Sequence, residues 1–158
     1  MHYPYTDILR ISLSSWLLSF FFLFPYHRNM SETLTFRKAE ETDVHLILTF
    51  IRELADYEGL LDEVKADEET LRYNLFERKM AEVLFPVLGG REIGFVLFFH
   101  NFSTFLAKPG IYIEDLYIRK EFRGHGYGKA TIDKIRALAA ERECGRVSGG
   151  AWTLTHHL

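Results

Sequence analysis

The chain has 158 residues, of which 47% are hydrophobic and 26% are charged, and its formal net charge is −3. This length and composition are typical of one globular domain with its own hydrophobic core. The sequence holds no basic block or Lys/Arg stripe, which argues against a nucleic-acid partner. Because Cys144 is the single cysteine, an internal disulfide is excluded, and we expect a reducing, cytoplasmic location.

The first 29 residues differ in composition from the rest. Residues 11–26 carry no charge and include a dense run of aromatic and aliphatic side chains. This run is shorter than the roughly 20 residues of a membrane-spanning helix, and no small-residue cleavage site follows it. We therefore expect residues 1–29 to lie outside the domain, with Met30 as the start of translation. A signal-peptide core or a short membrane anchor is the alternative.

The domain is expected to begin with a strand and two helices. Residues 34–38 alternate between apolar and polar side chains, as a half-buried strand does. Thr42 or Asp43 can cap a helix that ends near Gly59. Its apolar residues recur at helical spacing: Leu46, Ile47, Phe50, Ile51 and Leu54. A second helix is expected over residues 67–76, because its first turn is acidic and the helix dipole favours negative charge there.

The second part of the chain is expected to form strands and a long helix. Strands are predicted over residues 81–88 and 92–99, joined by a tight turn at Gly89–Gly90. After a loop around Asn101, Ser103 and Pro109, residues 111–118 read as a central strand covered on both faces. A helix over residues 127–142 follows, which Gly145 is placed to end. This order predicts an α/β domain in which helices flank a mixed central sheet.

The segment with the clearest chemical meaning is Arg123–Lys129, with the sequence RGHGYGK, between the central strand and the long helix. Glycines let the backbone approach a ligand closely, and a helix N-terminus presents unpaired N–H groups with positive partial charge. A pyrophosphate fits that place, and a merely flexible turn is the alternative. The G-x-G-x-G spacing matches neither the dinucleotide fingerprint G-x-G-x-x-G nor a Walker motif, since Gly128–Lys129 is followed by Ala130.

This segment, after a strand reading I-E-D-L-Y-I, resembles the acetyl-CoA site of the GNAT superfamily of N-acetyltransferases. Arg123, Gly126 and Gly128 occupy the positions of its signature Q/R-x-x-G-x-G/A. More narrowly, the chain resembles the diamine (spermidine/spermine) acetyltransferase branch. That branch has an acidic pair matched by Glu114–Asp115 and a Tyr-Glu pair matched by Tyr57–Glu58. The resemblance runs from about residue 33 to residue 147 and implies the GNAT fold.

The resemblance also implies roles for individual residues. Acetyl-CoA would be bound by Leu116, Tyr117, Ile118, Arg123, Gly124, His125, Gly126, Tyr127, Gly128 and Lys129, the first three through backbone groups. A polyamine, diamine or thialysine-like amine would be bound by Tyr57, Glu58 and Glu114, with Glu114 as the general base. A structural carboxylate is the alternative for Glu114, a solvated helix end for Tyr57 and Glu58, and a solvated ammonium for Lys129. Because related enzymes form homodimers, the resemblance also implies a homodimer. No His/Cys cluster has metal-ligand spacing, so no metal is expected.

The sequence departs from the family's pattern after Val147, where the expected strand fails. Residues 148–158 are unlike the family's C-terminal part, although with one choice of codons a one-base shift of reading frame gives Glu-Trp-Trp-Cys-Leu-Asp, close to the family's fifth strand. A frameshift near codon 148 would leave the fold incomplete. We therefore expect little or no activity from this chain, and the alternative to an acetyltransferase is an inactive coenzyme A-binding remnant.

Overall fold

The computed structural model describes residues 33–149; the expected N-terminal extension (1–29) and residues 150–158 of the expected tail lie outside this part. The strands are β1 (Thr35–Lys38), β2 (Glu82–Leu88), β3 (Arg91–Glu92), β4 (Gly94–Ser103), β5 (Lys108–Ile118) and β6 (Val147–Gly149). The helices are α2 (Val44–Glu58), α3 (Glu68–Arg72) and α4 (Tyr127–Glu141). A π-helical turn, η3 (Tyr73–Glu77), extends α3, and short 3-10 turns form η1 (Glu41–Asp43), η2 (Leu61–Glu63) and η4 (Lys120–Phe122).

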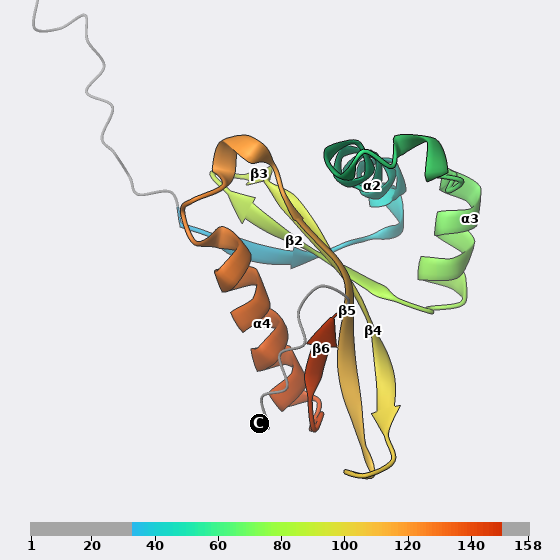
Figure 1. The fold of residues 1–158 in the computed structure, drawn as a ribbon, viewed down its shortest axis with the longest axis vertical. Coiled ribbons are helices and arrows are strands. Elements are labelled where there is room, and N and C mark those ends of the chain that lie inside the picture. The colour runs from blue at the N-terminus through green and yellow to red at the C-terminus, as the bar shows by residue number, and fades with distance from the viewer. Residues whose placement is uncertain (1–32, 150–158) are drawn as a thin grey trace, which may run out of the picture. The chain divides into compact units, whose positions relative to one another are not determined.

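The strands form one mixed sheet in the order β1-β2-β4-β5-β6, with β3 paired to β2 (Figure 1). All pairs are antiparallel except β5 and β6, which run parallel. Along β2, Val83 and Phe85 pack in one hydrophobic cluster, whereas Leu84 between them packs in another. Since successive side chains of a strand point to opposite faces, the sheet has a core on each face. This confirms the predicted α/β architecture with helices flanking a mixed sheet.

Each core is closed by different helices. The α2-side core consists of Ala39, Ile47, Phe50, Val83, Phe85, Phe95 and Tyr117, with apolar residues of α3 and η3 against it. The α4-side core consists of Leu84, Val96, Phe98, Ile111, Ile135, Ala139, Cys144 and Val147. In the α2-side core the Phe50 ring stacks on Phe95, with centroids 5.7 Å apart and planes 9° apart. None of the helices within residues 33–149 combines the length and apolar character needed to cross a bilayer.

Helix α2 ends where the sequence predicts. Gly59 has the left-handed conformation (φ 74°), and its N–H donates to the Asp56 carbonyl at 3.1 Å. At the other end Asp43 holds the N-cap position, but its carboxylate accepts from the Glu40 N–H (2.8 Å) and from Arg37 (2.7 and 2.9 Å). The helix therefore begins in a turn whose geometry is fixed by an ion pair with β1.

Two predicted boundaries are wrong. The expected loop around Asn101, Ser103 and Pro109 is strand, because β4 and β5 stay paired as far as Ser103 and Lys108. Gly145 does not end α4: the left-handed residue after that helix is Glu143 (φ 55°), and the Gly145 N–H donates to the Pro109 carbonyl at 2.8 Å. In both cases a partner distant in sequence, rather than local propensity, decides the conformation.

Strand β6 continues past the point where the sequence predicts its failure. It pairs with β5 through Ser148 and Gly149, the latter opposite Ile113. A Cβ added at Gly149 would lie 3.0 Å from the Ile113 carbonyl oxygen, so glycine allows the two strands to approach closely. Ser148 and Gly149, which were expected to lie beyond the strand, are therefore part of it.

The α2-side core supplies a test of the packing. Phe50 is 0% exposed whereas Phe105, at the β4–β5 turn, is 101% exposed. We expect Phe50→Ala to lower the free energy of unfolding by about 3–5 kcal/mol, because it leaves a cavity between Phe85 and Phe95. Phe105→Ala should change it by less than about 0.5 kcal/mol. Urea unfolding of both variants measures this, and equal effects would contradict the assigned core.

Candidate functional site

A row of free backbone amides lies at the start of α4. Gly124 and Gly126 both have positive φ (81° and 82°), and Gly126 is the N-cap of the helix. Within residues 33–149, none of the six N–H groups from Gly124 to Lys129 donates to a protein acceptor; the first that does is Ala130, to the Gly126 carbonyl at 2.9 Å. A Cβ at either glycine would meet nothing within 4 Å. Together with the helix dipole, these amides can hold an anion such as a pyrophosphate.

The side chains of this loop are arranged around the amides. His125 is exposed, with its ring 5.8 Å from that of Tyr127. The Lys129 ammonium is 79% exposed and lies 2.6 Å from Asp133, one turn along α4. A phosphate that used Lys129 would therefore compete with this ion pair.

Arg123 lies apart from the amide row. Its backbone N–H donates to the Lys120 carbonyl (3.2 Å), and its Nε donates to the Ile118 carbonyl (2.7 Å). Its guanidinium lies over two aromatic rings, 4.0 Å from the centroid of Tyr57 and 5.3 Å from that of Tyr117. The side chain thus joins the end of β5 to the end of α2.

The edge of β5 that leads to this loop is open. Strand β6 pairs only with residues 111–113 of β5, and no other strand of the described part covers residues 114–118 on that edge. An uncovered strand edge presents unpaired N–H and C=O groups to a ligand.

The backbone direction decides which groups reach this edge. The Arg119 N–H donates to the Ile93 carbonyl, so it points to the β4 side. Because the direction alternates along a strand, Tyr117 directs its groups to β4, and Leu116 and Ile118 direct theirs to the open edge. Of the three residues expected to bind a ligand through the backbone, two therefore face the edge, and Tyr117 contributes a buried ring.

A β-bulge interrupts β5 at the acidic pair. Leu97 on β4 lies opposite Asp115, but the next residue, Phe98, lies opposite Ile113. Glu114 is therefore the extra residue of the bulge. Bulges re-aim side chains and are frequent beside active sites.

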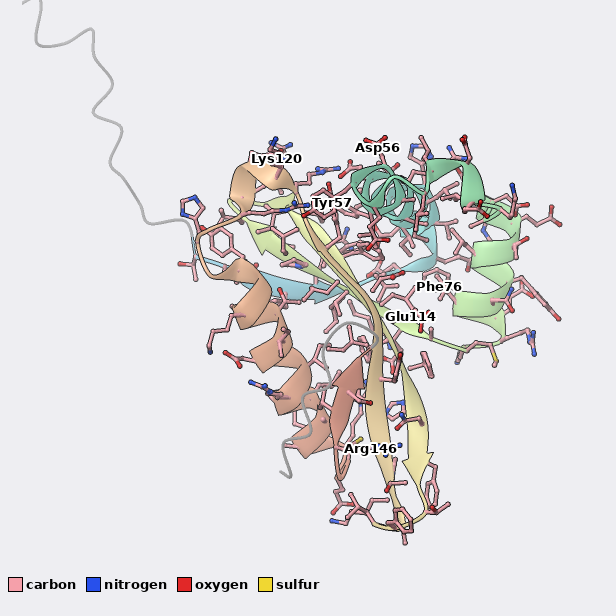
Figure 2. The ribbon with its side chains drawn as sticks, viewed as in Figure 1. Asp56, Tyr57, Phe76, Glu114, Lys120 and Arg146 are labelled. Atoms are coloured by element: carbon pink, nitrogen blue, oxygen red, sulfur yellow. The ribbon has the colours of Figure 1, made fainter. Side chains whose placement is uncertain are left out.

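The bulge turns both carboxylates to the same face. Ile113 and Leu116 both pack against the α4-side core, although strict alternation would place residues three apart on opposite faces. Glu114 and Asp115, between them, are consequently both directed to the α2 face. Figure 2 shows Glu114 on β5 and Tyr57 at the end of α2.

A third carboxylate joins this pair. Burial raises the pKa of Asp115, and the negative charges of Glu114 and Glu58 raise it further. Glu58 is the last residue of α2, so the two elements bring three acidic groups close together. The sequence marks Asp115 only as part of the acidic pair, although a carboxylate within an otherwise apolar strand indicates a role of its own. The cluster can bind a cation or accept a proton.

A cavity of about 390 Å³ lies elsewhere, between η3 and the ends of β1, β2 and α4. It is lined by Lys38, Ala39, Leu75, Phe76, Lys79, Ala81, Glu82, Val83 and Arg142. Arg142, at 3.0 Å, and Lys38, at 2.9 Å, lower the pKa of Glu82 to about 2. This ion pair ties α4 to β2, and the cavity contains none of the expected site residues.

The raised pKa of Asp115 predicts how the stability of the protein depends on pH. Since the pKa of Asp115 is raised above 3.8, its contribution to stability is present below that pH and is lost as pH rises through the folded-state pKa. We expect Asp115→Asn to raise the free energy of unfolding at neutral pH, with the gain shrinking toward about pH 4. Urea unfolding across this range measures it, with Asp62→Asn, an exposed carboxyl, as the control. If Asp115→Asn were less stable than the wild type at neutral pH, the conclusion that the Asp115 charge lacks a compensating partner would be wrong.

The chain is similar to one family of proteins and to several known proteins. The model of the acetyltransferase (GNAT) family matches residues 48–153. Thialysine N-epsilon-acetyltransferase of Sus scrofa is 38% identical over 118 residues, which cover 68% of each chain. L-ornithine N5-acetyltransferase NATA1 of Arabidopsis thaliana is 46% identical over 54 residues, 34% of this chain and 24% of that protein.

Among solved structures, an aminoglycoside acetyltransferase from a soil metagenomic sample, meta-AAC0020, aligns with a TM-score of 0.65 and 21% identity. The alignment covers 75% of this chain and 78% of that one, and at this identity it supports the fold alone. The family match and the thialysine acetyltransferase of Sus scrofa show the family as well as the fold. The chain belongs to the GNAT family of acetyltransferases.

Proposed function

We propose that this protein transfers the acetyl group of acetyl-CoA to a primary amine of a small diamine, polyamine or thialysine-like substrate. The observation that carries the proposal is the row of free amides from Gly124 to Lys129 beside the open edge of β5. An anion-binding loop and a strand edge suit the pyrophosphate and the amide-bearing arm of coenzyme A. The names of the relatives, which act on thialysine and ornithine, support a small amine as acceptor.

The residues present fit acetyl-CoA. The amides of Gly124, His125, Gly126, Tyr127, Gly128 and Lys129 would hold the pyrophosphate. Leu116 and the N–H of Ile118 would pair with the pantetheine arm, since the Ile118 carbonyl accepts from Arg123. Bound there, the cosubstrate supplies an activated acyl thioester. Glycine at 124 and 126 keeps this approach open because a Cβ at either position would project into the space that a ligand needs.

The acidic cluster fits the amine. A primary ammonium has a pKa near 10, about that of lysine, and must lose a proton before its nitrogen can attack. Glu58 and Asp115 would hold the positive charge beside Tyr57, and Glu114 would accept the proton. The neutral nitrogen would then attack the thioester carbonyl and the carbon–sulfur bond would break. The departing thiolate would take up the second proton that the nitrogen loses.

The similarity to acetyltransferases supports an active enzyme. It does not support the alternative, an inactive coenzyme A-binding remnant, that the unusual residues 148–158 suggested. The predicted homodimer, the cytoplasmic location and the absence of a nucleic-acid partner stay predictions from the sequence.

The direct test is an acetylation assay with acetyl-CoA and thialysine, spermidine or ornithine, with the product identified by mass spectrometry. We expect acetylation of at least one amine, and we expect Glu114→Gln to lower kcat/KM by roughly 100-fold, the usual contribution of a general base. Glu121→Gln, an exposed carboxylate on η4, is the matched control and should retain activity. Absence of acetylation of every amine would refute the proposal, and an unchanged Glu114→Gln would remove Glu114 as the base.

The cofactor loop gives a separate test. Gly126 (φ 82°) and Gly90 (φ 79°) both have left-handed backbone and room for a Cβ. Alanine at either position costs about 1–2 kcal/mol of backbone strain. We expect Gly126→Ala to weaken acetyl-CoA binding roughly 5- to 30-fold, since the strain opposes the binding conformation. Gly90→Ala, in the β2–β3 turn, should leave the affinity unchanged. Isothermal calorimetry measures both, and equal affinities would contradict an amide cradle at Gly126.

A further inference from the structure

The side chain of Arg123 contacts both halves of the proposed site. Its Nε binds the Ile118 carbonyl on the open edge of β5, and its guanidinium lies over the ring of Tyr57 at the end of α2. We propose that Arg123 is a positioning residue, not a phosphate ligand: it couples the amine-binding end of α2 to the cofactor-binding edge of β5. This inference rests on the proposed function.

The contacts argue against a phosphate role. A guanidinium 4.0 Å from a ring centroid is well within the range of a cation–π contact. To reach a phosphate at the amide row, the side chain would have to give up this contact and the 2.7 Å bond to Ile118. Its backbone N–H is also taken, by the Lys120 carbonyl. Arg123 therefore supplies nothing to the row of free amides that begins at Gly124.

The same contacts explain how the coupling would reach the amine. Tyr57 is 65% exposed, so few other contacts of the described residues hold its ring. Glu58 follows it directly, and the charge of Glu58 acts on Asp115. Loss of Arg123 would thus free the end of α2 and move one carboxylate of the acidic cluster. The guanidinium also occupies one face of the Tyr57 ring, which leaves the other face and the hydroxyl for the substrate.

The test is a double-mutant cycle of Arg123→Gln and Tyr57→Ala in the full chain. We expect each variant to raise KM for the amine roughly 10-fold and the double variant to raise it no further than the single variants do. In all three variants kcat and the acetyl-CoA Kd should stay within about 3-fold of the wild-type values. Tyr57→Phe keeps the ring under the guanidinium, so in urea unfolding its coupling with Arg123 should match that of the wild type. In urea unfolding, the pair should show a coupling of about 2- to 5-fold in the unfolding equilibrium constant.

A matched pair controls for the loss of an arginine–tyrosine contact as such. The guanidinium of Arg78 lies 5.8 Å from the ring centroid of Tyr73 on η3, and neither residue is among those expected to bind the amine or acetyl-CoA. Arg78→Gln and Tyr73→Ala should leave the amine KM unchanged.

Two results would overturn the inference. One is an increase of more than about 10-fold in the acetyl-CoA Kd of Arg123→Gln that is also seen, to the same extent, when Tyr57→Ala is present. Arg123 would then be a phosphate ligand. The other is the absence of coupling in the unfolding cycle. Failure of the proposed function is distinguishable, because the wild type itself would then neither bind acetyl-CoA nor acetylate an amine.

Discussion

The geometry of the site depends on one irregularity, the β-bulge at Glu114. A regular β5 could not place both Ile113 and Leu116 under α4, since residues three apart lie on opposite faces. The extra residue shifts the alternation by one, so the hydrophobic face is kept on both sides of the bulge. The two carboxylates inside it are then turned to the α2 face, where partial burial and the nearby negative charges raise the pKa of Asp115.

A single strand can serve two ligands of opposite charge because its edge and its faces point in different directions. The edge of β5 offers the backbone groups of Leu116 and Ile118 and leads to the amides at Gly124–Lys129, which attract anions. One face offers Glu114 and Asp115, which attract cations. The two ligands would thus approach β5 from different sides and meet near the bulge. The groups that bind the anionic ligand then lie apart from the carboxylates that bind the cationic one.

Local signals in the sequence predict much of this fold. The end of α2 at Gly59, the Gly89–Gly90 turn and the glycine-rich start of α4 each depend on backbone freedom within a few residues, and each is confirmed. The bulge and the pairing of β4 with β5 through Ser103 depend on partners elsewhere in the chain. No local pattern could predict them. The contact of Arg123 with Tyr57 could not be predicted either, because the two residues lie far apart in the sequence.

The placement of α2 is also a long-range effect, and it follows from two arginines spaced four residues apart. Arg119 binds the Glu53 carboxylate through two nitrogens, at 2.8 and 2.9 Å, and Arg123 covers Tyr57, one helical turn further along. Both contacts lie at the C-terminal end of β5, so they fix the rotation of α2 about its axis as well as its distance from the strand. A helix packed only by apolar contacts could slide or rotate with little change in buried area, and directional ion contacts remove that freedom. Glu58 is thereby held on the side of α2 that faces the bulge.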